Sequence, residues 1–81
     1  MRYILITREG CPYCSMAVDL LKEEGLEHNV VNFKHNQTDM LSEIKKAHDW
    51  KTVPMIFARE GNNIEFIGGY TDLKERMESN G

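Results

Sequence analysis

Short apolar runs alternate with amphipathic segments in the first third of the chain. Residues 2–7 are apolar and β-branched without polar alternation, which is typical of a strand that is buried on both faces. Gly10 ends this run, and Pro12 suits the first turn of a helix, where its missing N–H costs no hydrogen bond. Apolar residues then recur at helical spacing over residues 14–24, and Gly25 is a natural stop just past them. The pattern predicts a strand followed by a helix.

The middle of the chain predicts a second strand and a second helix. Residues 27–33 are rich in β-branched and aromatic side chains, as expected for a strand. Apolar residues recur at helical spacing over residues 40–48, which predicts a helix. Its candidate N-cap residues are Asn36, Thr38 and Asp39. The first two strands, joined by a helix, are expected to be parallel with a right-handed crossover.

The last third of the chain predicts a hairpin and a third helix. Residues 53–58 and 63–67 form two short apolar runs, and the connection between them, residues 60–62, contains Gly and Asn. Two such runs around a short Gly-containing connection are typical of a β-hairpin. Residues 71–78 then predict a final short helix, with Thr71 as its N-cap.

The complete order of elements is βαβ, then a helix, a ββ-hairpin and a final helix. This order predicts an α/β fold with a four-stranded mixed sheet flanked by three helices. A length of 81 residues supports a single domain, over residues 1–81. Hydrophobic residues make up 41% and charged residues 28%, which is ordinary for a globular protein and excludes a disordered chain.

Charge, apolar run length and cysteine content restrict the partners and the compartment. The formal net charge of −3, without a basic stretch, argues against nucleic acid as the main partner. Apolar runs of only about four residues predict no membrane segment. The N-terminal residues lack the pattern of a signal peptide, and two cysteines cannot form the disulfide framework of a small secreted domain. We therefore expect a reducing, cytoplasmic location.

The spacing of Cys11 and Cys14 is the strongest chemical signal in the chain. A C-x-x-C sequence directly after a strand and at the start of a helix is typical of a redox pair. The free N–H groups and the partial positive charge at a helix N-terminus stabilise a thiolate there. We expect Cys11 to attack the substrate, and Cys14, on the buried side of the first turn, to resolve the mixed disulfide that results.

Two other roles of a cysteine pair agree less well with the sequence. Zinc binding needs two further ligands, and His28, His35 and His48 show no paired short spacing, so no metal is expected. A purely structural disulfide between Cys11 and Cys14 would close a very small loop, which would stabilise the fold by only ~2 kcal/mol.

Three motifs occur together, in this order and spacing: Cys11-Pro12-Tyr13-Cys14, Thr52-Val53-Pro54 and Gly68-Gly69-Tyr70-Thr71-Asp72. Together they resemble a dithiol glutaredoxin, and the resemblance covers residues 3–77. It implies the thioredoxin-like fold and a glutathione-dependent thiol–disulfide oxidoreductase activity. It also implies a cis bond between Val53 and Pro54, which would let the Val53 backbone pair with an extended peptide beside Cys11.

The resemblance further implies a glutathione site around the cysteine pair. It assigns the glycine carboxylate of glutathione to Arg8 and Lys51, and the γ-glutamyl carboxylate to the backbone at Gly69 and Thr71. The carboxylate of Asp72 would pair with the γ-glutamyl ammonium. The remaining binding residues that it implies are Tyr13, Thr52, Val53 and Pro54.

The chain departs from the usual glutaredoxin pattern at two positions near this site. Tyr70 follows the glycine pair where many glutaredoxins carry a smaller residue, and Val18 stands where many carry a lysine. A tyrosine at this position could narrow the glutathione groove or offer an apolar contact to protein substrates.

The resemblance also implies the partners. Glutathione would be the reducing co-substrate of a monomer, protein disulfides and glutathionylated proteins would be its substrates, and ribonucleotide reductase is one implied client. One alternative is a thioredoxin-like electron donor recharged by thioredoxin reductase, against which the expected glutathione-binding residues count. Another is an iron–sulfur carrier that holds a cluster between two subunits with Cys11 and glutathione as ligands, which Pro12 disfavours.

Overall fold

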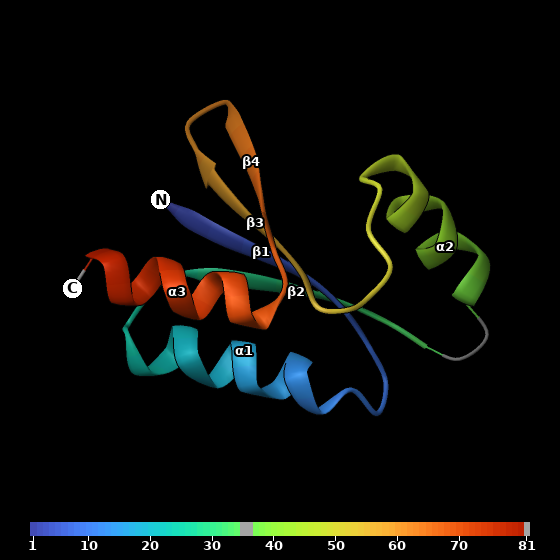
Figure 1. Cartoon of the computed structure of the whole chain (residues 1–81), viewed down its shortest axis with the longest axis horizontal. Coiled ribbons are helices and arrows are strands. Elements are labelled where there is room, and N and C mark those ends of the chain that lie inside the picture. Colours follow the sequence, from blue (N-terminus) through green and yellow to red (C-terminus); the bar gives the residue numbers. More distant parts are fainter. Residues whose placement is uncertain (35–36, 81) are drawn as a thin grey trace.

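The chain forms one β-sheet with helices packed against it (Figure 1). The computed structural model describes residues 1–34 and 37–80. The strands are β1 (Arg2–Arg8), β2 (His28–Phe33), β3 (Met55–Glu60) and β4 (Asn63–Gly68), and the helices are α1 (Pro12–Glu23), α2 (Thr38–Ala47) and α3 (Tyr70–Asn80). In this described part of the chain, no helix is both long and apolar enough to cross a membrane.

The strands form a four-stranded mixed sheet in the order β2-β1-β3-β4. β1 pairs with β2 in parallel, and the crossover between them contains α1. β3 pairs antiparallel with both β1 and β4, and the latter pair is the expected hairpin. This is the thioredoxin-like fold, and the prediction of a mixed sheet with three helices is confirmed.

The core lies between the sheet and the helix pair α1 and α3. Leu5 of β1, Leu21 of α1, Ile56 of β3 and Leu73 of α3 are fully buried and belong to one cluster. Figure 1 shows α1 and α3 side by side, whereas α2 lies apart from them, beside the loop that leads to β3. Burial of each such side chain contributes roughly 1.5–3 kcal/mol, so this cluster is the main anchor of α1 on the sheet.

β1 is buried less evenly than its sequence predicts. Tyr3, Leu5 and Thr7 are buried on one face, but Ile4 and Ile6 on the opposite face are only half-buried. The helices α1 and α3 cover the first face, whereas α2 stands to one side and leaves the second face partly open (Figure 1). The expectation of a strand buried on both faces is therefore wrong for the second face, which is only half-buried.

Two helix starts also differ from the prediction. α2 begins at Thr38 after the N-cap residue Gln37, whose side chain makes no capping hydrogen bond. Asp39 lies inside its first turn, and Asn36 lies outside the described residues. α3 begins one residue before Thr71, which therefore lies within the helix instead of capping it. N-cap preference is a local signal, and the path of the preceding loop decides where each helix begins.

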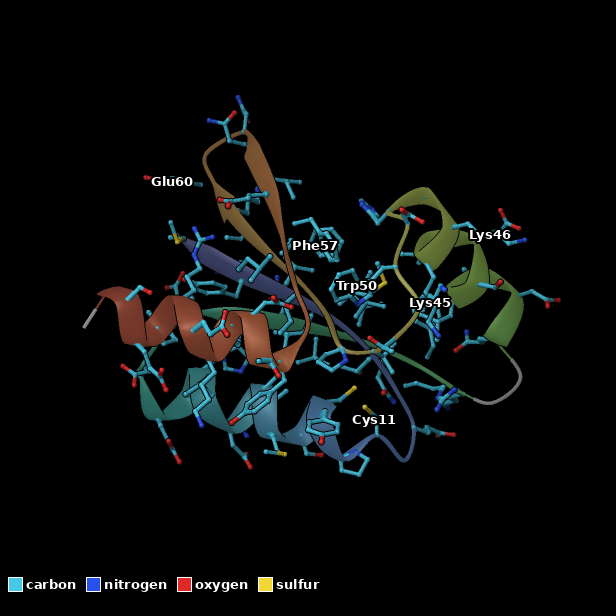
Figure 2. The ribbon with its side chains drawn as sticks, in the orientation of Figure 1. Cys11, Lys45, Lys46, Trp50, Phe57 and Glu60 are labelled. Carbon is cyan, nitrogen blue, oxygen red and sulfur yellow. The ribbon has the colours of Figure 1, made fainter. Side chains whose placement is uncertain are left out.

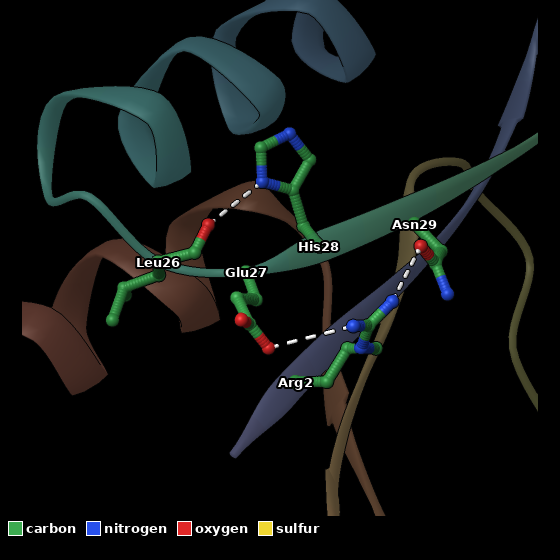
Figure 3. A network of polar contacts seen from close by, with 5 residues as sticks. All are labelled: Arg2, Leu26, Glu27, His28 and Asn29. Atoms are coloured by element: carbon green, nitrogen blue, oxygen red, sulfur yellow. Dashed lines mark hydrogen bonds and ion pairs between the residues drawn. The ribbon is translucent and has the colours of Figure 1, made fainter.

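Polar contacts join the beginnings of β1 and β2 at the edge of the molecule (Figure 3). The Arg2 guanidinium donates to Asn29 Oδ1 at 3.1 Å and lies 3.4 Å from Glu27 Oε2. His28 donates through Nδ1 to the carbonyl of Leu26 at 2.9 Å. The Arg2–Glu27 pair is exposed and stabilises the fold little. His28 is engaged locally, at the opposite end of the sheet from the cysteine pair.

Three connections meet at the other end of the sheet and build the site. The first, from β1 to α1, turns at Gly10, whose φ is +74°. The second, from α2 to β3, contains the Val53–Pro54 bond, which is cis as predicted. The third, from β4 to α3, turns at Gly68, whose φ of +126° favours glycine. Side chains from α1 and from the other two connections line one groove at this end.

Candidate active site

Cys11 is the N-cap residue of α1, with Pro12 in the first turn as predicted. Its Sγ atom accepts a hydrogen bond from the backbone N–H of Cys14 at 3.2 Å. A thiolate at this position would receive a charge-assisted hydrogen bond and the partial positive charge of the helix end. Cys11 is partly exposed, whereas Cys14 is only 5% exposed. The expected arrangement, with one accessible and one buried sulfur, is present.

A second contact places the Cys11 sulfur beside the cis-proline loop. Cys11 Sγ lies 3.7 Å from the carbonyl oxygen of Val53, to which the thiol donates a weak hydrogen bond. Figure 2 shows Cys11 at the start of α1, on the side of the molecule where this loop turns toward β3. The sulfur is therefore held between a helix N-terminus and a stretch of backbone that precedes a strand.

The Cys14 thiol is held in its protonated form. The pKa of Cys14 is raised from 9.0 to about 12, mainly by burial and further by the hydrogen bond and negative charge of Cys11. A backbone hydrogen bond from Arg8 and its positive charge act in the opposite direction. A thiol with a pKa of about 12 stays neutral at pH 7, so Cys14 does not begin the reaction.

We expect Cys14 to make the reduced protein less stable as the pH rises above about 9. The unfolded chain releases the Cys14 proton near pH 9.0, whereas the folded chain keeps it to a pKa of about 12. Between these two pKa values, each rise in pH stabilises the unfolded state relative to the folded state. The free energy of unfolding therefore falls by at most ~1.4 kcal/mol per pH unit. Urea unfolding under reducing conditions, from about pH 8 to about pH 10, measures this slope.

The matched control for this measurement is Cys14→Ser. Serine has nearly the same shape but does not ionise in this range, so the variant shows the pH dependence that does not come from Cys14. The variant should show the shallower slope. Equal slopes in the two proteins would mean that burial does not hold the Cys14 proton.

A groove of about 310 Å³ opens beside the cysteine pair and gathers most of the predicted binding residues. Its walls come from α1, from the loop before β3 and from the start of α3. The residues that line it are Tyr13, Trp50, Thr52, Val53, Pro54, Gly69, Tyr70, Thr71 and Asp72. The fold thus brings together, from three separate parts of the sequence, all the predicted binding residues except Arg8 and Lys51.

Arg8 and Lys51 do not line this groove. Arg8 lines a second, larger cavity of about 650 Å³, which is also lined by Cys11, Cys14 and side chains of α1 as far as Lys22. Lys51 is exposed on the loop directly before Thr52 and lines neither of these two cavities. The structure does not bring these two cations into one cavity, and their joint contact with a carboxylate stays a prediction.

The Asp72 side chain folds back onto the backbone at the start of α3. Its Oδ2 atom accepts the backbone N–H of Gly69 at 2.9 Å, and the Gly69 carbonyl accepts the N–H of Leu73 at 3.1 Å. A side chain at Gly68 would overlap the Asp72 carboxylate. Glycine at this position therefore allows the carboxylate to fold back onto the helix start. Asp72 is nevertheless exposed, so that it can also meet a cation in the groove.

Two groove residues were absent from the predicted set. Trp50 packs on Phe66 of β4, with ring centres 5.2 Å apart, and faces the groove as well. The ring of Tyr70 lies 6.2 Å from that of Tyr13. The glycine pair before Tyr70 was a signal for its position, because the chain turns there. Nothing in the sequence around Trp50 indicates that its ring reaches the groove.

His28 and His48, the two histidines in the described part of the chain, do not line this groove. His48 packs against Phe57 and Phe66, with ring centres 5.1 Å and 5.4 Å apart. Among residues 1–34 and 37–80, no three His, Cys, Asp or Glu side chains gather closely enough to hold a metal ion. His35 lies outside the described residues.

A C-x-x-C pair at a helix N-terminus, beside a cis-proline loop on a thioredoxin-like fold, defines the class of thiol–disulfide oxidoreductases. The glutaredoxin family model matches residues 4–62 of the chain. The chain is 31% identical to glutaredoxin 1 of Escherichia coli (strain K12), over 99% of this chain and 96% of the relative. The chain belongs to the glutaredoxin family.

Other relatives and solved structures agree with this assignment. A glutaredoxin of Neisseria meningitidis serogroup B is 31% identical over 95% of this chain and 86% of its own. The crystal structure of glutaredoxin 1 from Francisella tularensis, complexed with cacodylate, superposes with a TM-score of 0.73 at 27% identity. It covers 96% of this chain and 93% of its own. The solution structure of glutaredoxin from Brucella melitensis gives a TM-score of 0.75 at 30% identity, over 98% and 80%.

Proposed function

We propose that the protein is a glutathione-dependent oxidoreductase that reduces glutathione mixed disulfides and protein disulfides through Cys11 and Cys14. The observation that carries the proposal is the groove beside Cys11, which ends at the start of α3 and at the Asp72 carboxylate. Glutathione is a short peptide with two carboxylates and one ammonium. The groove offers backbone for its cysteinyl part, helix N–H groups for a carboxylate and Asp72 for the ammonium.

With a glutathionylated substrate, the reaction needs only Cys11. Its thiolate attacks the glutathione sulfur, so that a Cys11–glutathione bond forms and the substrate sulfur leaves as a thiolate that takes up a proton. The thiolate of a second glutathione then attacks the bound glutathione sulfur. This step forms glutathione disulfide and returns Cys11 to its thiolate form.

With a protein disulfide, both cysteines react. Cys11 attacks one sulfur of the substrate and the other sulfur leaves as a thiolate. Cys14 loses its proton and attacks Cys11 Sγ, which forms the Cys11–Cys14 disulfide and releases the reduced substrate. Two glutathione molecules reduce this disulfide in turn, and glutathione disulfide is the final product.

Arg8 and Lys51 complete the proposed site. Arg8 shares a cavity with Cys11, and Lys51 precedes the loop residues that line the groove. Both are exposed cations at the edge of the site, where they would attract the glycine carboxylate of glutathione from solution. We further propose a cytoplasmic monomer with ribonucleotide reductase among its clients. The presence of only two cysteines, too few for the disulfide framework of a small secreted domain, supports the location.

The test is a pair of coupled assays that follow the consumption of NADPH. One contains a small glutathione mixed disulfide, glutathione and glutathione reductase, and the other contains a protein disulfide and thioredoxin reductase. We expect strong turnover only in the first. Turnover only in the second would mean that the groove does not bind glutathione and that the protein is a thioredoxin-type donor. A brown colour after anaerobic purification with iron and glutathione would instead support the iron–sulfur carrier.

A further inference from the structure

The indole N–H of Trp50 is a buried hydrogen-bond donor without an acceptor. Its Nε1 atom is covered from solvent and has no hydrogen-bond partner among the described residues. Buried donors are nearly always paired, because leaving one unpaired destabilises the fold. The Trp50 backbone, by contrast, is engaged: its N–H donates to the carbonyl of Lys45 at 2.8 Å. The unpaired donor therefore belongs to the ring alone.

The ring of Trp50 lines the groove beside the start of α3. It meets Phe66 nearly at right angles, with an interplanar angle of 84°. A Cβ atom added at Gly69 would lie 3.7 Å from Trp50 Cζ2, so this edge of the indole faces the glycine that precedes α3. Nε1 is on the same edge, one ring atom removed from Cζ2. Figure 2 shows Trp50 close to Phe57, between the β3–β4 hairpin and α2.

We propose that the Trp50 indole N–H is a further binding group of the groove and donates a hydrogen bond to an oxygen of the γ-glutamyl end of glutathione. This inference rests on the proposed function. Its basis is the placement of the unpaired donor beside Gly69, whose N–H is held by the Asp72 carboxylate. A γ-glutamyl group that pairs its ammonium with Asp72 brings its carboxylate and amide oxygens to this position. Because the ring already lines the groove, a small turn of the indole would be enough to expose Nε1 to it.

The first test observes the indole N–H directly. Trp50 is the single tryptophan of the chain, so a protein labelled with ¹⁵N in its indole gives one ring N–H resonance. In the Cys14→Ser variant, Cys11 is converted to its mixed disulfide with glutathione or, as a control, with cysteamine. We expect a downfield proton shift and slower exchange with water only in the glutathione adduct. The same spectrum for both adducts would overturn the inference.

The second test uses substrate kinetics. Trp50→Phe keeps an aromatic ring and removes the N–H, and it should raise KM for a glutathione mixed disulfide about tenfold while kcat stays within about twofold. A cysteinylglycine mixed disulfide lacks the γ-glutamyl group, and its KM should not change. Phe66→Leu is the matched control, because it loosens the packing of the same indole but removes no donor. It should leave KM for the glutathione substrate near that of the unsubstituted protein.

The outcomes separate this inference from the proposed function. An unsubstituted protein without glutathione-dependent turnover would overturn the proposed function, and the inference with it. Normal turnover together with an unchanged KM in Trp50→Phe would overturn the inference alone. An equal rise in KM for both substrates would also overturn it, because a general loss of packing would then explain the effect. If Trp50→Phe does not fold, the resonance of the native indole decides.

Discussion

Replacing Cys11 with serine is expected to reduce turnover with every disulfide substrate by roughly a thousandfold or more, to the uncatalysed background. A serine hydroxyl cannot exchange with a disulfide, and no second thiolate is available near the groove. Cys14 is 5% exposed, and its burial, which is the largest cause of its raised pKa, stays in the variant, so it cannot replace Cys11 as the attacking group. The coupled NADPH assay with a glutathione mixed disulfide measures the loss.

The Cys11→Ser variant should fold normally, which makes it a test of chemistry alone. Cys11 is the N-cap of α1 and its sulfur accepts the N–H of Cys14. Serine is among the preferred N-cap residues and its oxygen can accept the same N–H. The variant should therefore unfold at a urea concentration similar to that of the unsubstituted protein. Substantial turnover in a folded Cys11→Ser protein would mean that the attacking group has been assigned wrongly.

Much of the fold could be predicted because its signals are local or periodic. The helical spacing after Pro12, the stop at Gly25 and the hairpin connection at residues 60–62 each act within a few residues of the chain. The uneven burial of Ile4 and Ile6 could not be predicted in the same way. It depends on where α2 lies relative to the sheet, and no property of the β1 sequence determines that position.

The same distinction between local signals and contacts of distant elements applies to the site. Motif spacing was enough to place Tyr13, Val53 and Asp72 together, and one groove contains all of them. The contribution of Trp50 depends on a ring from β4 beneath it and a glycine from the start of α3 beside it. These elements are distant in sequence, so an unpaired indole N–H is visible only after the chain is folded. The strongly raised pKa of Cys14 has a similar origin, since burial by the core is its largest cause.

Replacing Cys14 with serine is expected to separate the two activities. Turnover of a glutathione mixed disulfide needs only Cys11 and should stay within about threefold, because the helix N-terminus and the groove are unchanged. Reduction of a protein disulfide should almost stop, since no second thiol of the protein remains to release the substrate from Cys11. A covalent adduct of Cys11 with the substrate protein should then accumulate, and electrophoresis without reductant detects it.

The physical reason for this separation is a change in the Cys14 thiol that follows the first step. In the reduced protein, burial raises the pKa of Cys14, and the hydrogen bond and charge of Cys11 raise it further. Once Cys11 is in a mixed disulfide it carries no negative charge, so the second cause disappears while the opposing effect of Arg8 remains. The pKa of Cys14 should therefore fall only after Cys11 has reacted. Cys14 then ionises more readily when the mixed disulfide that it attacks is already present. Without glutathione, release of the substrate from its mixed disulfide with Cys11 should accelerate as the pH rises in the unsubstituted protein, whereas the adduct of Cys14→Ser should persist. A Cys14→Ser protein that reduces protein disulfides at the normal rate would show that glutathione, and not Cys14, resolves the adduct.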